Sequence, residues 1–224
     1  MGLRATLINA SLDFLFRTFC RIDDSDLKKL PLQGPAILLS NHTSNLEGPL
    51  FYVRLRPRPT IALAKAELWK VFATRMIMEA WSAIPVRRGR LDRQALGRCQ
   101  RVLERGEFLC LAPEGRRSKD GTLLRGQPGT AWFAADKNIP VYPMVQWGCR
   151  TILKELAHLR RPHIVIRVGR PFVVATPEEH VGGRDQLQAM ADEIMGQVAL
   201  ALPEEYRGYY RDPALHTTNF LKFV

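Results

Sequence analysis

Cysteine is scarce in this chain, and the few cysteines lie far apart. Among 224 residues there are four, Cys20, Cys99, Cys110 and Cys149, and no two of them form a C-x-x-C pair. Zinc sites and disulfide frameworks need cysteines at closer, regular spacings. The spacing therefore predicts free thiols in a reducing compartment and no structural metal.

Long apolar runs are missing as well. A membrane-spanning helix needs roughly 18 consecutive apolar residues, and no run in the chain approaches that length. Arg4, Asp13 and Arg17 interrupt the first segment, where the apolar stretch of a signal peptide would be continuous. We therefore expect the protein to stay on the side of the membrane where it is made, the cytoplasmic side.

Acidic residues are few compared with basic ones. The chain has 33 Lys and Arg against 22 Asp and Glu, a formal net charge of +11. Such a charge predicts a polyanionic partner: nucleic acid, anionic lipid or a phosphorylated substrate. The aromatic residues are not interleaved with the basic clusters as stacking platforms, and no recognised nucleic-acid-binding module is present. Lipid surfaces and phosphorylated substrates are therefore favoured over nucleic acid.

The chain does contain enough apolar sequence for one sizeable core. Hydrophobic residues make up 46% of it, and short apolar runs alternate with helical patterns. The expected strands cover residues 37–39, 60–64, 108–111, 141–145 and 164–168, and the expected helices cover 3–20, 50–55, 67–80, 91–105, 129–136 and 184–202. This alternation predicts an α/β fold with a mostly parallel or mixed central sheet flanked by helices.

The expected N-terminal helix is amphipathic. Its apolar residues recur at three- and four-residue steps, and Arg4, Asn9, Asp13 and Arg17 fall on the other side. The apolar set is Leu3, Leu7, Ile8, Leu12, Leu15, Phe16 and Phe19. Such a helix either packs on the core or lies in a membrane interface, and periodicity does not distinguish the two.

Three segments follow from these patterns. Residues 1–30 are assigned as a membrane-docking segment and residues 31–202 as the α/β domain. Residues 203–224 form a C-terminal tail that has several aromatic residues but no clear period.

A histidine and a carboxylate lie five residues apart, directly after the first expected strand. A histidine such as His42, when held by a carboxylate such as Glu47, can act as a general base. Ser44 and Glu47 also match a capping box, in which the carboxylate only satisfies a helix N–H group. A helix capped at Ser44 would place Pro49 at its fifth residue, where proline is costly. We therefore expect the helix to begin at Pro49, and His42 and Glu47 to meet in one loop.

Other polar residues follow the neighbouring expected strands. In an open α/β sheet, ligands bind beyond the carboxyl ends of the strands. Lys65 follows the second strand, and the Pro-Glu-Gly-Arg-Arg-Ser segment of residues 113–118 follows the third. Three arginines, Arg87, Arg88 and Arg90, lie between them in sequence. Arginine forks and a glycine that lets the backbone approach suit a phosphate group; the alternative is a solvated basic loop.

Four blocks in this chain resemble those of the glycerolipid acyltransferase family, which includes the 1-acylglycerol-3-phosphate acyltransferases. Residues 41–47 are similar to its N-H-x4-D block, and residues 83–88 to its second block. Residues 112–118 resemble F-P-E-G-T-R-S, and residues 139–144 resemble V-P-I-x-P-V. Four matches in the family's order are more specific than any single motif.

Three departures from the family pattern stand out. The carboxylate is Glu47 rather than an aspartate, and Arg87 stands where the second block usually has an acid. Ala112 and Arg116 replace the aromatic residue and the threonine of the third block. A glutamate can still orient an imidazole. The departures leave open a different lipid or glycolipid acceptor, or a catalytically inactive lipid-binding relative.

The resemblance implies an O-acyltransferase of phospholipid synthesis that works at a membrane surface without a cofactor or metal. The acyl group would move from acyl-CoA or acyl carrier protein to a hydroxyl of a lysophospholipid, 1-acylglycerol-3-phosphate. His42 would take the hydroxyl proton and Glu47 would hold its tautomer. Lys65 and the backbone around Gly115 are the expected oxyanion partners. The expected acceptor-binding residues are Arg88, Glu114, Gly115, Arg116 and Arg117, of which Arg88 and Arg117 match the phosphate-contacting arginines of the family.

Overall fold

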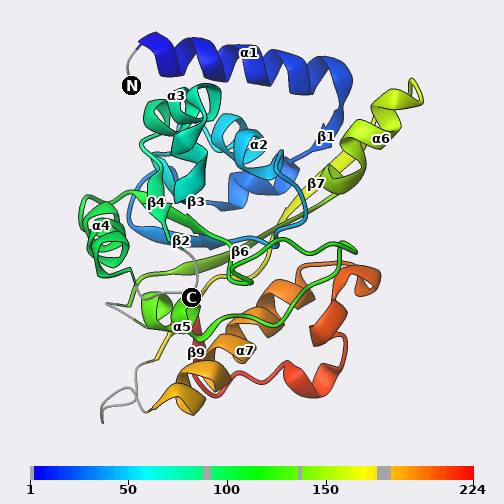
Figure 1. Cartoon of the computed structure of the whole chain (residues 1–224). Helices are drawn as coiled ribbons and strands as arrows, with labels where there is room; N and C mark the ends of the chain where they lie inside the picture. Colours follow the sequence, from blue (N-terminus) through cyan, green and yellow to red (C-terminus); the bar gives the residue numbers. More distant parts are fainter. Residues whose placement is uncertain (1–2, 88–91, 136–137, 176–182) are drawn as a thin grey trace.

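The computed structural model describes residues 3–87, 92–135, 138–175 and 183–224, and one mixed sheet lies at its centre (Figure 1). The strands of the described residues are β1 (Arg21–Asp23), β2 (Ala36–Leu39), β3 (Thr60–Lys65), β4 (Ile84–Val86), β5 (Phe108–Leu111), β6 (Val141–Trp147), β7 (His163–Val168), β8 (Phe172–Val174) and β9 (Leu221–Phe223). Their order is β1-β7-β6-β2-β5-β3-β4, and β8 and β9 extend from β6.

Most strand pairs in this sheet are parallel. β2 pairs in parallel with β5 and β6, β3 pairs in parallel with β5 and β4, and β1 pairs in parallel with β7. β6 runs antiparallel to β7 and β8. The predicted mostly parallel or mixed sheet is confirmed, and the carboxyl ends of β2, β3, β4 and β5 meet at one edge.

Helices cover both faces of the sheet. They are α1 (Leu3–Phe19), α2 (Glu47–Arg54), α3 (Phe72–Ala80), α4 (Arg93–Glu104), α5 (Pro128–Ala134), α6 (Ile152–Ala157) and α7 (Arg184–Leu200). Figure 1 shows α1, α2 and α3 on one side and α5 and α7 on the other. Within β2, Leu38 joins the core on the α2 side and Ile37 the core on the α7 side. A strand buried on both faces reads as a continuous apolar run.

The amphipathic helix forms, but the predicted division of its faces is wrong in part. Asn9 is buried, and its side-chain oxygen accepts a hydrogen bond of 2.8 Å from the indole N–H of Trp81. Asp13 forms an ion pair with Arg54 of α2. These two polar residues therefore face the domain, because partners are available there, and several large apolar residues point to solvent. The exposed ones are Leu3, Leu7, Phe14, Leu15 and Phe19.

Some boundaries also differ from the sequence prediction. The expected helix over residues 67–80 is divided into a 3-10 helix, Ala66–Lys70, and α3. Ile84–Val86, expected to be a loop, forms β4 at the edge of the sheet. A proline is tolerated in a strand at an edge, where its missing N–H leaves no ladder bond unmade. No helix among the described residues is long and apolar enough to cross a membrane.

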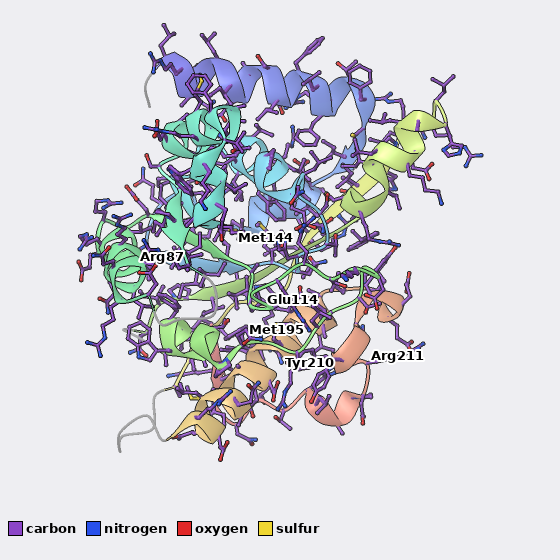
Figure 2. The ribbon with its side chains drawn as sticks, viewed as in Figure 1. Arg87, Glu114, Met144, Met195, Tyr210 and Arg211 are labelled. Carbon is purple, nitrogen blue, oxygen red and sulfur yellow. The ribbon has the colours of Figure 1, made fainter. Side chains whose placement is uncertain are left out.

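The C-terminal segment packs on the α/β domain. The hydroxyl of Tyr210, which is fully buried, donates to Asp192 of α7 at 2.6 Å and accepts from the N–H of Gly126 at 2.9 Å. β9 continues the sheet by pairing with β8. Figure 2 labels Tyr210 and Met195, a buried residue of α7, and the two belong to the same hydrophobic core cluster.

Candidate active site

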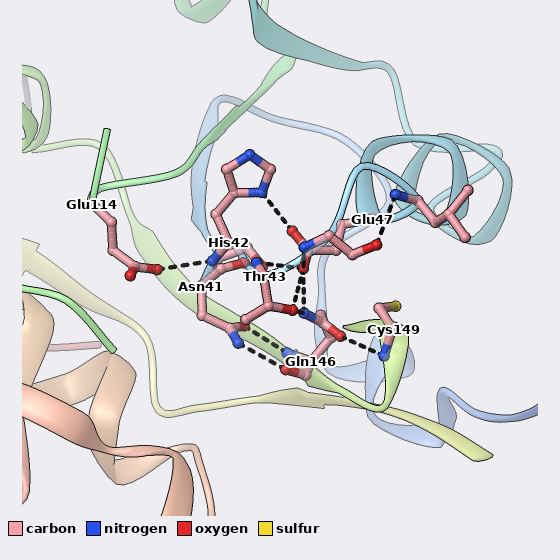
Figure 3. A network of polar contacts seen from close by, with 10 residues as sticks. Asn41, His42, Thr43, Glu47, Glu114, Gln146 and Cys149 are labelled. Carbon is pink, nitrogen blue, oxygen red and sulfur yellow. Dashed lines mark hydrogen bonds and ion pairs between the residues drawn. The ribbon is translucent and has the colours of Figure 1, made fainter. Parts of the chain in front are cut away.

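The loop after β2 brings His42 and Glu47 together, as expected. The Nδ1 atom of His42 lies 2.6 Å from Oε2 of Glu47 (Figure 3). The Glu47 side chain is 4% exposed and that of His42 is 23% exposed. The carboxylate is thus shielded from water while the imidazole remains accessible.

The surroundings of Glu47 determine which nitrogen of His42 carries a proton. Oε1 of Glu47 accepts from the N–H groups of Thr43 and Ser44, the Thr43 hydroxyl and the Gln146 side-chain amide, each at 2.7 Å. Four donors around one oxygen favour the ionised carboxylate, which only accepts hydrogen bonds. Nδ1 of His42 therefore donates to it, and Nε2 is left with a lone pair that can take a proton.

The start of α2 combines the two interpretations of Glu47. The helix begins at Glu47, two residues earlier than the predicted start at Pro49, which was wrong. Pro49 is tolerated because N–H groups in the first turn have no partner within the helix. The Ser44 N–H donates to Glu47 as in a capping box, but the N-cap of α2 is Leu46, which makes no side-chain cap bond, and the Ser44 hydroxyl accepts from the Leu46 N–H at 3.2 Å. Glu47 thus orders the loop before α2 and holds His42 at once.

Asn41, which is part of the 41–47 block, and Gln146, which the sequence analysis missed, connect this loop to the sheet. The Asn41 side chain bonds both the N–H and the C=O of Gln146 on β6, at 2.9 and 2.8 Å. The Gln146 side chain is fully buried and reaches Glu47. A glutamine within an otherwise apolar strand was the available signal, since a buried amide needs partners.

Glu114 braces the backbone of His42 from the opposite side. Its Oε1 accepts the His42 N–H at 2.8 Å (Figure 3). Its Oε2 accepts the Leu124 N–H at 2.9 Å. The Ser118 N–H also donates to the His42 carbonyl at 2.7 Å. Burial raises the pKa of Glu114 to about 7, although both N–H bonds oppose that rise. Glu114 was expected among the acceptor-binding residues. In the structure its carboxylate connects two loops by accepting a backbone N–H from each.

A cavity of about 850 Å³ opens beside His42. Its lining includes His42, Glu47 and three basic residues, Lys65, Arg87 and Arg116. The rest is largely apolar and includes Phe51, Leu63, Val86, Leu96, Leu111 and Phe133. One cavity thus brings basic side chains, an imidazole and a largely apolar wall together.

The other predicted residues divide into several groups. Lys65 lines the cavity, with its ammonium 3.7 Å from Glu67. Gly115 also lines it, but its N–H already donates to the Ala112 carbonyl at 3.0 Å. Arg116 is part of the lining and Arg117 is not. Arg88 lies outside the described residues, whereas its neighbour Arg87 is seen beside α4 (Figure 2).

Part of this chain is similar in sequence to curated proteins. The chain is 27% identical over 138 residues to 1-acyl-sn-glycerol-3-phosphate acyltransferase BAT2, chloroplastic, of Brassica napus, a match that covers 60% of this chain and 40% of that protein. It is 31% identical over 122 residues to the 1-acyl-sn-glycerol-3-phosphate acyltransferase of Limnanthes douglasii, covering 50% of this chain and 41% of the relative. The chain thus spans about 40% of the length of these curated relatives.

A solved structure shares the fold. The 1-acyl-sn-glycerophosphate acyltransferase PlsC of Thermotoga maritima superposes with a TM-score of 0.61 at 20% identity, covering 85% of this chain and 76% of that one. The family model described as Acyltransferase matches residues 21–147, which include both members of the His42–Glu47 pair. Because this match spans more than half of the chain, the protein belongs to the acyltransferase family.

Proposed function

We propose that this protein transfers a fatty acyl group from an acyl thioester to the hydroxyl of a lysophospholipid, 1-acylglycerol-3-phosphate. The observation that carries the proposal is the buried Glu47 carboxylate 2.6 Å from Nδ1 of His42, beside a largely apolar cavity whose lining includes Lys65, Arg87 and Arg116. The names of the relatives support the same acceptor. The donor is acyl-CoA or acyl carrier protein, and both share the reacting thioester.

The proposed reaction uses His42 as the base. Its Nε2 takes the proton of the acceptor hydroxyl while the hydroxyl oxygen attacks the thioester carbonyl carbon. The tetrahedral intermediate carries an oxyanion, for which the Lys65 ammonium is the proposed cationic partner. Collapse breaks the C–S bond, and the departing thiolate receives the proton from the imidazolium. Glu47 stabilises the imidazolium throughout, and no acyl-enzyme intermediate is needed.

The arginines that line the cavity, Arg87 and Arg116, are proposed to hold the acceptor phosphate. Neither side chain takes part in an ion pair within the described part of the chain, although Asp92, which also lines the cavity, interacts electrostatically with Arg87. Guanidinium groups that line a cavity suit a dianionic phosphate. In this proposal Arg116, which replaces the threonine of the family pattern, contributes to acceptor binding.

The protein is further proposed to reach its acceptor by docking peripherally on a bilayer, on the cytoplasmic side. The outward face of α1 exposes Phe14 at 67% and Leu3 at 77%, and Arg4 and Arg17 lie on the same helix. Large apolar side chains next to arginines are typical of helices that lie in a membrane interface.

Turnover of labelled acyl thioesters tests the proposed function. Purified protein is given acyl-CoA or acyl carrier protein thioesters with a panel of lysophospholipids. The His42→Ala variant should lose at least about 100-fold in rate, as expected for a lost general base. His158→Ala is the matched control, since His158 is exposed and lies outside the cavity lining. Lipid binding by the wild type without turnover would favour an inactive relative.

A further inference from the structure

Gln146 contacts the Glu47 carboxylate from outside the loop that leads from β2 into α2. Among the donors to Oε1 of Glu47, Thr43 and Ser44 belong to the same loop, and Gln146 comes from β6 (Figure 3). Its Nε2 is 2.7 Å from Oε1 of Glu47 and 3.1 Å from the Thr43 hydroxyl oxygen. The carboxylate is thereby tied to the central sheet.

The sheet itself determines where Gln146 lies. The pairing of β2 with β6 ends at Leu39 and Pro143, so β6 continues beyond its partner on that side. The Asn41 side chain takes the place of the missing strand and makes two hydrogen bonds with the Gln146 backbone. Gln146 follows Met144 by two residues, so it points to the same face of the sheet, the face that α2 covers. The register between loop and strand is therefore fixed.

The hydrogen bonds of the Gln146 side-chain amide indicate its role. One hydrogen of its NH2 group goes to Glu47 and the other to Thr43. The Thr43 oxygen then accepts, which leaves its own hydrogen to point at Oε1 of Glu47, 2.7 Å away. Gln146 thus supplies one donor to the carboxylate and directs a second. Donors to an anionic carboxylate favour its ionised form without adding net charge.

We propose that Gln146 is a positioning residue for the base, an inference that rests on the proposed role of His42. It keeps Glu47 ionised and aimed at Nδ1, so that His42 presents Nε2 to the acceptor hydroxyl. It touches neither substrate, and its effect is exerted through Glu47.

The Gln146→Leu variant removes both donors with little change in volume. We expect kcat to fall about 10- to 100-fold, the loss of a hydrogen bond to a charged group, with the KM for the acceptor unchanged. A carboxylate with fewer donors holds an imidazolium more tightly, so the acidic limb of the pH–rate profile should move to higher pH. Gln197→Leu is the matched control, because Gln197 is buried on α7, which contributes nothing to the cavity lining. It should leave both the rate and the profile unchanged.

The Gln146→Glu variant tests the same role with an isosteric side chain. At low pH its neutral carboxyl group still donates one hydrogen bond to Glu47. At higher pH two carboxylates at this distance repel each other. The activity of Gln146→Glu relative to the wild type should therefore be retained at low pH. It should be lost on the alkaline side, where the wild type remains active. If Gln146→Leu does not fold, Gln146→Glu still tests the positioning role of Gln146.

A third test needs no substrate. The titration of the His42 imidazole is followed by NMR with labelled histidine, and the His42 signal is assigned with the His42→Ala variant. We expect a higher midpoint in Gln146→Leu than in the wild type. Equal midpoints and equal rates, with His42→Ala inactive, would refute the positioning role and leave the proposed function intact. If the wild type showed no acyl transfer, the proposed function would fail, and the NMR midpoints alone would support or refute the positioning role.

Discussion

Glu47 is the residue in which ordering of the loop before α2 and the proposed chemistry overlap. Its Oε1 accepts the N–H of Ser44 in that loop, as in a capping box, and its Oε2 contacts His42. A cap bond is typically worth about 1 kcal/mol, whereas the orientation of a base affects the rate by orders of magnitude. The two roles can therefore be separated by measuring stability and turnover in parallel.

Glu47→Gln should lower turnover by at least about 100-fold, because an amide cannot hold the Nδ1–H tautomer as a carboxylate does. Ser44→Ala should leave turnover near the wild-type value, since its hydroxyl accepts only from Leu46 at 3.2 Å. Thermal unfolding and acyl transfer are measured on both variants. Equal destabilisation of the two, with activity retained in Glu47→Gln, would favour a purely structural role.

Glu114 predicts how stability depends on pH. Burial raises its pKa from 4.5 to about 7, so the folded state binds a proton more tightly than the unfolded chain. The contribution of this group is fully present below pH 4.5 and is lost as the pH rises to about 7. Glu114→Gln should flatten the dependence of the melting temperature on pH across this range. An unchanged slope in the variant would show that Glu114 ionises normally.

Arg116 and Arg117 form a matched pair of neighbours. Arg116 lines the cavity and Arg117 does not, although both are exposed. Arg116→Ala should raise the KM for a phosphorylated acceptor about tenfold, because an arginine that binds ground state and transition state alike affects KM. Arg117→Ala should have a smaller effect, and an acceptor without a phosphate should respond to neither. A larger effect at Arg117 would support the assignment implied by the family pattern.

At the scale of elements, α1 has two faces that differ in their contacts: one packs on the domain and the other is exposed. The inner face carries Asn9, which bonds Trp81, and Asp13, which pairs with Arg54. Phe16 is buried on this face too. The outer face exposes large apolar side chains beside Arg4 and Arg17. The helix can therefore be fixed to the domain and still offer an apolar surface.

Replacing outer residues should affect membrane binding alone. Leu7, Phe14 and Leu15 are exposed, so changing all three to serine should abolish sedimentation with vesicles while the melting temperature stays the same. Turnover of a soluble short-chain acceptor should persist. Phe16→Ser on the buried face is the contrast and should lower the melting temperature by creating a cavity. Undiminished vesicle binding by the triple variant would place the membrane contact elsewhere.

At the scale of the whole molecule, the net charge of +11 adds a long-range attraction to anionic surfaces. Binding to anionic vesicles should weaken as salt is raised from about 0.1 M to 1 M, since the Debye length falls from about 10 Å to about 3 Å. Binding to neutral vesicles, which depends on apolar burial, should not weaken. Sedimentation with both kinds of vesicle measures the difference. Equal salt dependence for the two would remove electrostatics from the docking proposal.

The local sequence pattern was sufficient to predict much of the sheet and the contact between His42 and Glu47. Buried strands such as β2 and β5 read as short apolar runs, and His42 with Glu47 follows the first of them within one loop. The four blocks also predicted the family to which the chain belongs. These features depend on neighbours in sequence, which a pattern records directly.

Tertiary structure decided the rest, because it depends on partners far away in sequence. Gln146 is 99 residues from Glu47, and Glu114 is 72 residues from His42. No local pattern indicates that these side chains meet. Asn9 likewise faces inward because Trp81, 72 residues away, offers an indole N–H. The sequence by itself determined the residues of the proposed base and its carboxylate, and only the packing of strands and loops determined what holds them in place.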